Sequence, residues 1–325
     1  MKIFYLVPSN DKPSWGMGII YHHVNILCKG GFDCSIIKEK NLFVPGWLNL
    51  KVSVKDYDYL KKEIRQDDFL VVPESMLDFP GLKKIKCRKI VFIQNTGFLF
   101  ESMPKGEDHI SLGFQHIFIH MPHMISIIEN HVKLPYTIIP PFVAEYFFTN
   151  GLQQKRQRQI LIYPKFHQID YSVLKYLTER RVNDVNKHWT KDIFKQENWK
   201  VNELKNLSHE ETAEEMKKSI FFISLNVFES LNASVTEAMA AGCIVFCYEG
   251  FGPRDFLDDR VNAFSFKNNE VYELVETLFN QIDNYTKNED ALKLMRQNAF
   301  ETAKGYSQAK TEKALLSFFA NSSNA

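Results

Sequence analysis

The sequence has few cysteines, no charge excess and no long apolar run. Its 325 residues include 5 Cys, none in a CxxC pair, so a disulfide framework and a thiolate zinc site are both unexpected. Lys plus Arg total 40 and Asp plus Glu 39, which excludes a strongly basic protein built around nucleic acid. No stretch reaches the roughly 18 apolar residues of a membrane span. These absences favour a protein of the reducing cytoplasm.

The composition is that of a globular protein of more than one domain. Hydrophobic residues make up 45% of the chain, and chains longer than roughly 250–300 residues tend to divide into domains. The apolar residues 3–7 are followed at once by Pro8, Asn10 and Asp11, so we expect no signal peptide. The absence of an internal repeat excludes a solenoid.

Short β-branched and aromatic runs alternate with helical segments. These runs have few alternating polar positions, which is typical of strands buried on both faces of a parallel sheet. Between them, helical patterns predict right-handed crossovers and an α/β fold. The first of these helices is expected at Ile19–Lys29 and to end at Gly30-Gly31. The expected strands are Ile3–Val7, Cys34–Ile37, Asp68–Pro73, Lys89–Gln94, His116–His120, Thr137–Ile139, Ile160–Tyr163, Ile220–Leu225 and Cys243–Tyr248.

Residues 150–159 interrupt this alternation. The segment is polar and contains three basic residues, which favours a linker between domains, with a loop inside one domain as the alternative. We therefore expect a first Rossmann-like domain at residues 1–150, a second at residues 151–305 and a final helix at residues 306–325. In the second domain, Ser208 and Glu211 form a capping-box pattern at the start of a helix.

The segment 220–257 contains the residues most suited to ligand binding. A buried strand ends near Leu225, and a loop of small residues leads to a helix that begins around Asn232–Ser234. The free amides and the dipole of a helix start favour an anion. Glu229 precedes that helix and Glu237 lies about one turn inside it, so two carboxylates can bind vicinal hydroxyls beside the anion. This pattern predicts a nucleotide-sugar pocket; the alternative is an ordinary helix glutamate and a solvated loop glutamate.

The run Glu229–Val245 also resembles a family signature. Glu229, Glu237 and the Glu-Ala-Met-Ala-x-Gly run that ends at Gly242 match the Glu-x7-Glu pattern of the retaining glycosyltransferases of family four. The resemblance implies the GT-B fold, with two Rossmann-like domains facing across a cleft and a final helix that crosses back to the first domain. Weaker similarities to the family occur at Lys29–Asp33, Ile138–Val143, Ile160–Phe166, Asn206–Glu211 and Tyr306–Gln308.

On the donor side, the resemblance implies a role for each matching residue. Glu229 would contact the donor sugar near the reacting carbon, Lys165 would neutralise the leaving diphosphate, and Glu237 would bind the ribose. The amides of Leu231 to Ala233 would surround the diphosphate. The donor-binding set is Ser230, Leu231, Asn232, Ala233, Ser234, Glu237 and Arg254.

On the acceptor side, the loop Ser14–Gly18 occupies the place of the family's glycine-rich loop. His120 and Asn95 follow strands of the first domain and can reach a substrate from the carboxyl ends of those strands. The expected acceptor-side residues are Trp15, Gly16, Met17, Gly18, Asn95 and His120.

The chain departs from the family pattern at three positions. Asn232 replaces a Gly, so an Asn must adopt the tight turn, which Asn tolerates better than most residues. Pro164 replaces the Gly before the basic residue, and Asp170 stands near the place of a second basic residue. Arg254 can compensate for that missing charge.

The resemblance implies an enzyme that moves a sugar from a nucleotide-diphosphate sugar to a glycan or lipid-linked glycan. This enzyme would need neither a metal ion nor a cofactor. It would act in surface polysaccharide or glycoconjugate synthesis. The alternatives are a non-catalytic, glycan-binding partner subunit and a sugar-nucleotide epimerase.

We expect a cytoplasmic protein that does not bind nucleic acid. The basic residues at 83–89 can contact anionic lipid on the inner face of a membrane or form a solvated surface. His116, His120 and His123 form an HxxxHxxH run, for which we favour a core or cleft role over a metal site. Gly16-x-Gly18 is a weak dinucleotide signal, because no acidic residue ends the second strand.

Overall fold

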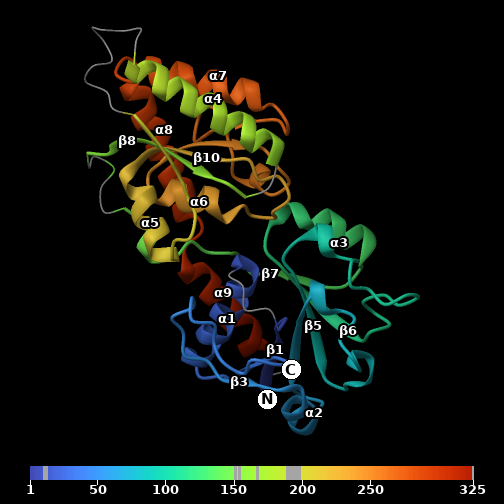
Figure 1. Ribbon diagram of the computed structural model, residues 1–325. Helices are drawn as coiled ribbons and strands as arrows, with labels where there is room; N and C mark the ends of the chain where they lie inside the picture. The colour runs from blue at the N-terminus through green and yellow to red at the C-terminus, as the bar shows by residue number, and fades with distance from the viewer. Residues whose placement is uncertain (10–13, 150–151, 153–154, 166–167, 188–198, 324–325) are drawn as a thin grey trace. The chain divides into compact units, whose positions relative to one another are not determined.

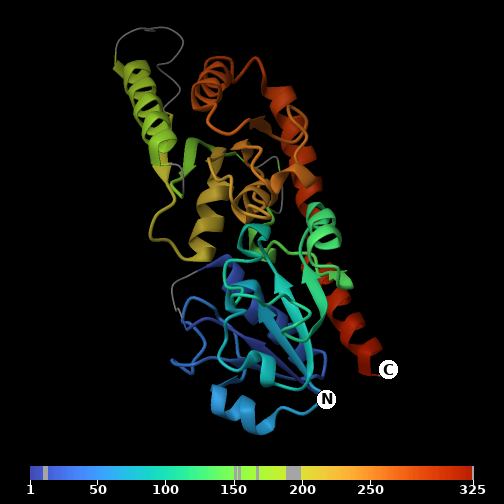
Figure 2. The same ribbon diagram turned by 90° about the vertical axis from the view of Figure 1, so that its right-hand side faces the viewer.

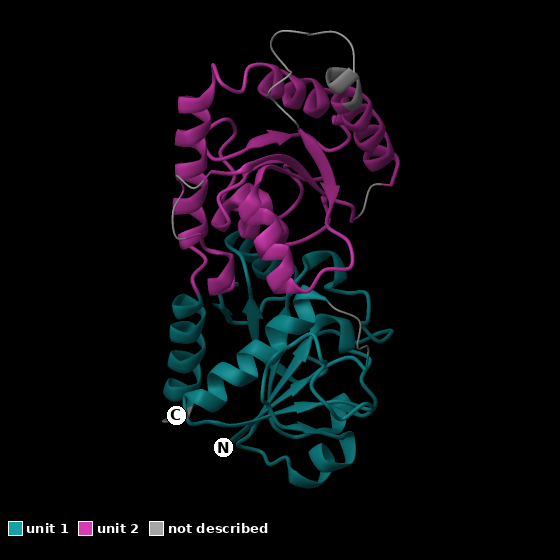
Figure 3. Ribbon diagram, turned by 60° about the vertical axis from the view of Figure 1, so that its left-hand side comes forward, with its two compact units in different colours: residues 1–142, 308–325 teal, residues 143–307 magenta. Residues whose placement is uncertain are grey.

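The chain folds into two compact α/β units. The computed structural model describes residues 1–9, 14–149, 152, 155–165, 168–187 and 199–323 (Figure 1). Residues 1–142 and 308–325 form unit 1, and residues 143–307 form unit 2 (Figure 3). Each unit has its own parallel sheet, as the alternation of strands and helices predicts.

Unit 1 contains a seven-stranded parallel sheet in the order β3-β2-β1-β4-β5-β6-β7. The run Phe69–Pro73 shows why these residues form strands, because all five of its side chains are buried. The strands are β1 (Lys2–Leu6), β2 (Asp33–Ile37), β3 (Val54–Lys55), β4 (Phe69–Pro73), β5 (Arg88–Ile93), β6 (Phe114–Ile119) and β7 (Tyr136–Ile138), and the helices are α1 (Trp15–Lys29), α2 (Tyr57–Glu63), α3 (Ile125–His131) and α9 (Gln308–Ser323).

Helix α1 begins earlier than its apolar pattern indicates. The periodicity predicts a start at Ile19, whereas the helix starts at Trp15 because the Ser14 hydroxyl accepts a hydrogen bond from the Met17 amide at 3.2 Å. It ends as expected at Gly30-Gly31, where Gly31 has a φ of 87°.

The final helix, α9, packs into unit 1. Leu315 and Phe319 are fully buried in a core that includes β1, α1 and Phe69. The Thr311 hydroxyl donates to the Pro140 carbonyl at 2.7 Å, and an Arg88 nitrogen donates to the Ser322 carbonyl at 2.7 Å. Helix α9 therefore ends at the amino edge of the sheet, where β1 begins (Figures 1 and 2). The expected return of the last helix to the first domain is confirmed.

Unit 2 contains a five-stranded parallel sheet in the order β12-β11-β10-β8-β9. Helices α4 and α7 cover one face, and α5 and α6 cover the other, with α8 packed beside α6 (Figure 1). The strands are β8 (Gln157–Tyr163), β9 (Lys200–Glu203), β10 (Ser219–Ser224), β11 (Ile244–Tyr248) and β12 (Phe264–Phe266), and the helices are α4 (Gln168–Lys187), α5 (His209–Lys218), α6 (Ala233–Ala240), α7 (Val271–Asp283) and α8 (Glu289–Lys304).

The segment expected to be a linker lies inside unit 2, which begins at Val143. Arg156 is tied to this unit, because its guanidinium donates to the carbonyls of Ser219 at 2.9 Å and Ala241 at 2.6 Å. Strand β8 then begins at Gln157. The alternative interpretation, a loop within one domain, therefore fits the described part of the segment. Residues 150–151 and 153–154 lie outside the described residues.

Helix α5 carries the capping box that the sequence predicts. The Ser208 hydroxyl accepts from the Glu211 amide at 3.2 Å, and the Glu211 carboxylate accepts from the Ser208 amide at 2.7 Å. Within the described part of the chain, none of the helices combines the length and the apolar character that crossing a bilayer requires.

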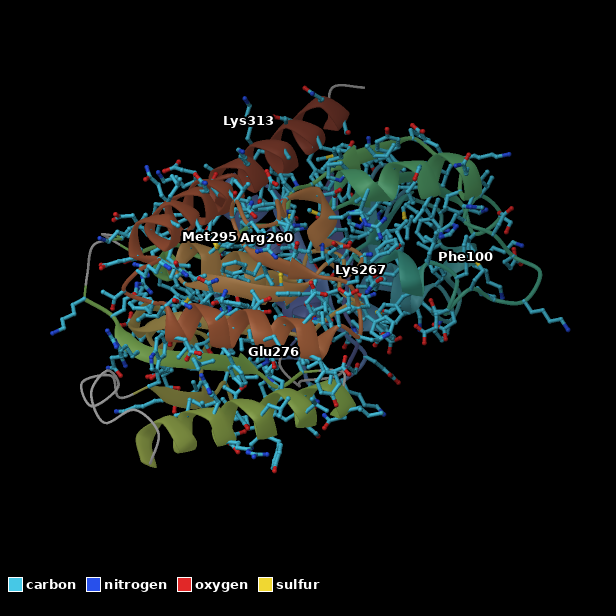
Figure 4. The ribbon with its side chains drawn as sticks, turned by 90° about the horizontal axis from the view of Figure 1, so that it is seen from above. Phe100, Arg260, Lys267, Glu276, Met295 and Lys313 are labelled. Carbon is cyan, nitrogen blue, oxygen red and sulfur yellow. The ribbon has the colours of Figure 1, made fainter. Side chains whose placement is uncertain are left out.

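The packing of α9 gives a prediction about stability. Phe319→Ala removes a fully buried ring and should cost about 3–5 kcal/mol of unfolding free energy. Lys313→Ala is the matched control, because Lys313 is exposed on the same helix and projects outward (Figure 4). Thermal unfolding followed by circular dichroism should show a lower midpoint for Phe319→Ala alone. Equal midpoints for the two variants would contradict the packing described here.

Candidate active site

The topology of unit 2 brings Lys165 and Glu229 together. Strand β8 pairs with both β9 and β10, so the chain order reverses beside it, and ligands of such sheets bind beyond the carboxyl ends of the strands at this point. Tyr163 in β8 is in register with Ser224 in β10. Lys165 follows the first strand and Glu229 follows the second, and the Lys165 Nζ lies 2.7 Å from the Glu229 Oε1. Because both side chains are partly exposed, this pair contributes position and charge rather than much stability.

Asn232 makes the turn that leads into α6. Its φ of 55° and ψ of 65° are left-handed, so the tight turn expected at this position is present. The Asn232 side-chain amide donates to the Asn226 carbonyl at 3.3 Å, and its oxygen accepts from the Ser234 hydroxyl at 2.9 Å. These contacts hold an Asn in the conformation that a Gly would adopt without strain.

The start of α6 retains free hydrogen-bond donors. The Asn232 side chain does not cap the helix. The backbone amides of Leu231 and Asn232 donate to none of the described residues. Ala233 and Ser234 form the first turn, and all eight residues of the helix are buried. Amides of this kind, together with the helix dipole, suit an anion.

Glu237 is almost buried in α6, with 6% of its surface exposed. Its Oε1 lies 2.9 Å from the His209 Nε2, and the Tyr146 hydroxyl lies 2.5 Å from the His209 Nδ1. Partial burial of the His209 ring, whose side chain stays 43% exposed, lowers its pKa. The hydrogen bond to Glu237 and the charges of Glu237 and Glu210 outweigh this effect, so the pKa lies above 6.5. The buried carboxylate therefore has a partner that can carry a positive charge.

Tyr163 lies within electrostatic reach of both glutamates. Burial raises the pKa of its hydroxyl well above 10, and the charges of Glu229 and Glu237 raise it further. Since one phenol is affected by both carboxylates, the two acids belong to one region at the carboxyl end of β8 and β10.

The loop at residues 249–255 packs directly on the Glu229 loop. A Cβ on Gly252 would lie 1.6 Å from the Ser230 carbonyl oxygen, and the Phe251 amide donates to the Val227 carbonyl at 3.1 Å. In this loop the Arg254 Nε donates to the Phe251 carbonyl at 2.7 Å, and the guanidinium lies over the Phe251 ring. Arg254 is thus in the loop that supports Ser230.

Asp170 has a structural partner. Its Oδ2 accepts a hydrogen bond from the Tyr248 hydroxyl at 2.6 Å, which ties the start of α4 to the end of β11. Pro164 connects β8 to Lys165. Phe166, which ends one of the weaker similarities, lies outside the described residues.

In unit 1, most of the expected acceptor-side residues gather at the carboxyl edge of the sheet. The rings of Trp15 and His120 meet edge to face at 5.4 Å. A Cβ on Gly16 would lie 2.3 Å from the side-chain oxygen of Gln94, the residue before Asn95. Met17 and Gly18 instead face the interior of unit 1, where Met17 is buried and Gly18 lies against the Trp47 ring.

The sequence analysis did not identify several residues that lie beside the donor-side and acceptor-side residues. Glu74 follows β4 and is buried, and its Oε1 accepts from the Asn95 amide at 2.9 Å. Burial raises the pKa of this carboxyl to about 7. An acid directly after a buried strand is the signal that could have identified Glu74. Tyr146 and His209 have no comparable signal, because they are far apart in the chain.

The three histidines of the HxxxHxxH run do not gather into a metal site. The His116 Nε2 lies 2.8 Å from the Thr137 hydroxyl, and the His120 Nδ1 lies 3.2 Å from the Ile139 carbonyl oxygen. Across the described residues, no three His, Cys, Asp or Glu side chains are placed to hold a metal ion.

The basic residues at 83–89 are largely used within unit 1. Lys83 pairs with Glu107 at 2.7 Å, and the Lys89 Nζ donates to the Leu112 carbonyl at 2.8 Å. Arg88 donates to the Ser322 carbonyl. This segment is therefore not a uniformly exposed basic surface.

Comparisons with known proteins give two matches to the sequence of this chain. Residues 186–302 match the family model described as glycosyl transferases group 1. The chain is 27% identical over 262 residues to an alpha-1,6-glucosyltransferase of Actinobacillus pleuropneumoniae serotype 7 (strain AP76), covering 74% of this chain and 71% of that protein.

Solved structures match almost the whole chain. A glycosyltransferase from Rickettsia africae ESF-5 superposes with a TM-score of 0.71 at 13% identity, over 99% of this chain and 98% of that one. HepE of Anabaena, solved in complex with UDP, superposes with a TM-score of 0.66 at 10% identity, over 99% and 100%. The chain has the GT-B fold. Together, the family model, the curated relative and the fold support a glycosyltransferase.

The contact between the two loops of unit 2 gives a prediction that glycine is required at one position. Gly252→Ala must displace the Ser230 carbonyl, which should cost about 1–3 kcal/mol of unfolding free energy. Gly46→Ala is the control, because a Cβ there has none of the described atoms within 4 Å apart from those of Gly46 and its chain neighbours. Urea unfolding should distinguish the two variants. An unchanged midpoint for Gly252→Ala would refute the close packing.

Proposed function

We propose that the protein transfers a sugar from a nucleotide-diphosphate sugar to a glycan hydroxyl, with retention at the anomeric carbon and without a metal ion. One observation carries the proposal: Glu229 and Glu237 flank the start of α6, and each has a basic partner, Lys165 at 2.7 Å and His209 at 2.9 Å. The uncapped helix start between them suits a diphosphate. The match to the glycosyl transferase family model and the GT-B fold both support this proposal.

The donor would bind along this edge of unit 2. Glu237 would accept hydrogen bonds from the ribose hydroxyls, and the amides of Leu231 to Ala233 would bind the diphosphate. Ser230, Asn232 and Ser234 shape that turn, and Arg254 adds a positive charge from the supporting loop. The Glu229 carboxylate would bind hydroxyls of the sugar close to its anomeric carbon.

In the proposed reaction, the bond between the anomeric carbon and the diphosphate oxygen breaks while the acceptor oxygen bonds to the same face of that carbon. The acceptor proton passes to the departing phosphate oxygen. Negative charge grows on the diphosphate, and Lys165 together with the helix amides would stabilise it. Preorganised charge stabilisation of this kind is commonly the largest part of an enzyme's rate enhancement.

The acceptor would be recognised by residues of unit 1. Trp15 offers a half-buried ring beside His120, and Asn95 follows β5 at the same edge of the sheet. Aromatic rings with nearby polar groups suit a glycan. We place the reaction in surface polysaccharide or glycoconjugate synthesis in the cytoplasm, an environment that fits the free cysteines. Contact with anionic lipid would be made by Lys84 and Lys86, which are exposed in the segment 83–89.

A second candidate is a non-catalytic partner subunit that binds a glycan. The observation that favours it is Asp170, which is bound to Tyr248 near the place where the family has a second basic residue. Calorimetry with UDP, GDP, dTDP and CMP separates the two candidates. A glycosyltransferase should bind at least one of these nucleotides, and binding of none would favour the partner subunit.

Glu229→Ala should abolish transfer while the fold and nucleotide binding persist. Loss of a group that acts near the reacting carbon should lower kcat about 100- to 1000-fold, with the nucleotide Kd changed less than about threefold. Release of nucleotide from the matching nucleotide sugar and an acceptor panel measures kcat. Glu276→Ala is the control, since Glu276 is exposed on α7 (Figure 4). Helix α7 covers the face of the sheet opposite to the one that α6 covers. Wild-type turnover of Glu229→Ala would remove Glu229 from the site.

Glu237→Ala should instead weaken nucleotide binding. A hydrogen bond to a charged group is worth about 1.5–3 kcal/mol, so Kd should rise about 10- to 150-fold. Isothermal titration of the nucleotide that the panel selects measures this change. An unchanged dissociation constant would contradict the ribose role.

A further inference from the structure

His209 is held at both ring nitrogens. Its Nε2 lies 2.9 Å from the Glu237 Oε1 and its Nδ1 lies 2.5 Å from the Tyr146 hydroxyl. The rings of Tyr146 and Phe147, which belong to a short 3-10 helix at Glu145–Phe147, meet the imidazole edge to face at 5.6 and 4.7 Å. The imidazole is thus fixed in one orientation toward a buried carboxylate.

These contacts suit both protonation states of the imidazole. In the neutral form, the Tyr146 hydroxyl donates to Nδ1 and the Nε2–H donates to Glu237. Burial and the charges of Glu210 and Glu237 raise the pKa of Tyr146 well above its usual range, so its hydroxyl keeps its proton and can donate. In the protonated form, Nδ1–H donates to the Tyr146 oxygen and the contact to Glu237 becomes an ion pair. His209 can therefore gain a proton without losing either partner.

Protonation of His209 changes the net charge beside the proposed ligand. Glu237 on α6 and Glu210 on α5 both raise the pKa of His209, and the Tyr146 hydroxyl contacts its Nδ1. Tyr163 at the end of β8 is affected by the charge of the same Glu237. An anionic ligand at the start of α6 meets the carboxylates of Glu229 and Glu237. Lys165 offsets the first charge, and a protonated His209 offsets the second.

We propose that His209 is a positioning residue that orients the Glu237 carboxylate for the ribose and that, when protonated, strengthens the binding of a nucleotide-diphosphate sugar. This proposal rests on the donor site described under the proposed function. The free Glu237 oxygen accepts the ribose hydroxyls, while His209 holds the other oxygen.

The direction of the pH effect follows from linkage. Contact with Glu237 raises the pKa of His209 above 6.5 in the free protein. An anionic ligand raises it further, so the ligand binds the protonated form more tightly. Affinity is therefore highest below this pKa and falls as the pH rises through it. A further rise of one pKa unit on binding corresponds to about a tenfold change in affinity.

A purely structural role for His209 would give a different result. Since the folded-state pKa is raised, the contribution of the pair to stability is present below about pH 6.5 and is lost as the pH rises through the raised pKa. That effect changes the unfolding midpoint but not the dissociation constant of folded protein. Ligand affinity must therefore be measured directly.

The test uses the full chain and nucleotide sugars whose phosphates do not titrate in the range studied. UDP-glucose, GDP-mannose and dTDP-glucose are titrated calorimetrically, and the tightest is followed from about pH 6 to about pH 8.5. We expect the wild-type Kd to rise about three- to tenfold over this range. His209→Gln retains a donor to Glu237 but cannot titrate, so its Kd should not depend on pH. His131→Gln, on α3, is the control and should follow the wild-type profile.

Tyr146→Phe keeps the ring but removes the hydroxyl at Nδ1, so the midpoint of the pH profile should shift. The imidazole C2–H resonance of His209 is identified by NMR as the one that is absent from His209→Gln, and its titration reports the pKa. The pKa of His209 should rise when the nucleotide sugar is added. A wild-type pH profile in His209→Gln would overturn this inference while leaving the donor site intact. If none of the three nucleotide sugars binds, the donor site and the inference both fail.

Discussion

Binding of an anion at the start of α6 depends on how the charges of two nearby carboxylates are offset. Glu229 and Glu237 lie at the start of α6, where a diphosphate is proposed to bind, and unpaired they would repel it. Lys165 lies 2.7 Å from the first and His209 lies 2.9 Å from the second. Each acid can then serve as a hydrogen-bond acceptor for hydroxyls without leaving the region strongly negative.

Backbone geometry places these pairs. The switch in chain order beside β8 brings the residues after β8 and β10 to one edge of the sheet, and the left-handed turn at Asn232 starts α6 there. Gly252 lets a second loop pack against the Ser230 carbonyl. The helix start therefore rests on tightly packed backbone, which favours a fixed arrangement of donors over one assembled by the ligand.

Features that depend on residues close together in the chain could be predicted from the sequence. Buried strand runs, the Ser208–Glu211 capping box and the turn at Asn232 follow from patterns of a few residues. Features could not be predicted where a side chain forms its hydrogen bonds with a residue far away in the chain. Arg156 lies in a segment with the composition of a linker, yet it binds the carbonyl of Ala241. Likewise, Tyr146 and His209 are 63 residues apart and meet only in the folded unit. Strands as short as Val54–Lys55 leave no periodic signal.

A crystal structure with a bound nucleotide-diphosphate sugar tests the central claim most directly. We expect ribose hydroxyls within hydrogen-bond distance of Glu237, the diphosphate on the amides of Leu231 to Ala233, and the sugar beside Glu229. A ligand bound at another place, or one whose ribose and sugar hydroxyls contact neither carboxylate, would contradict it.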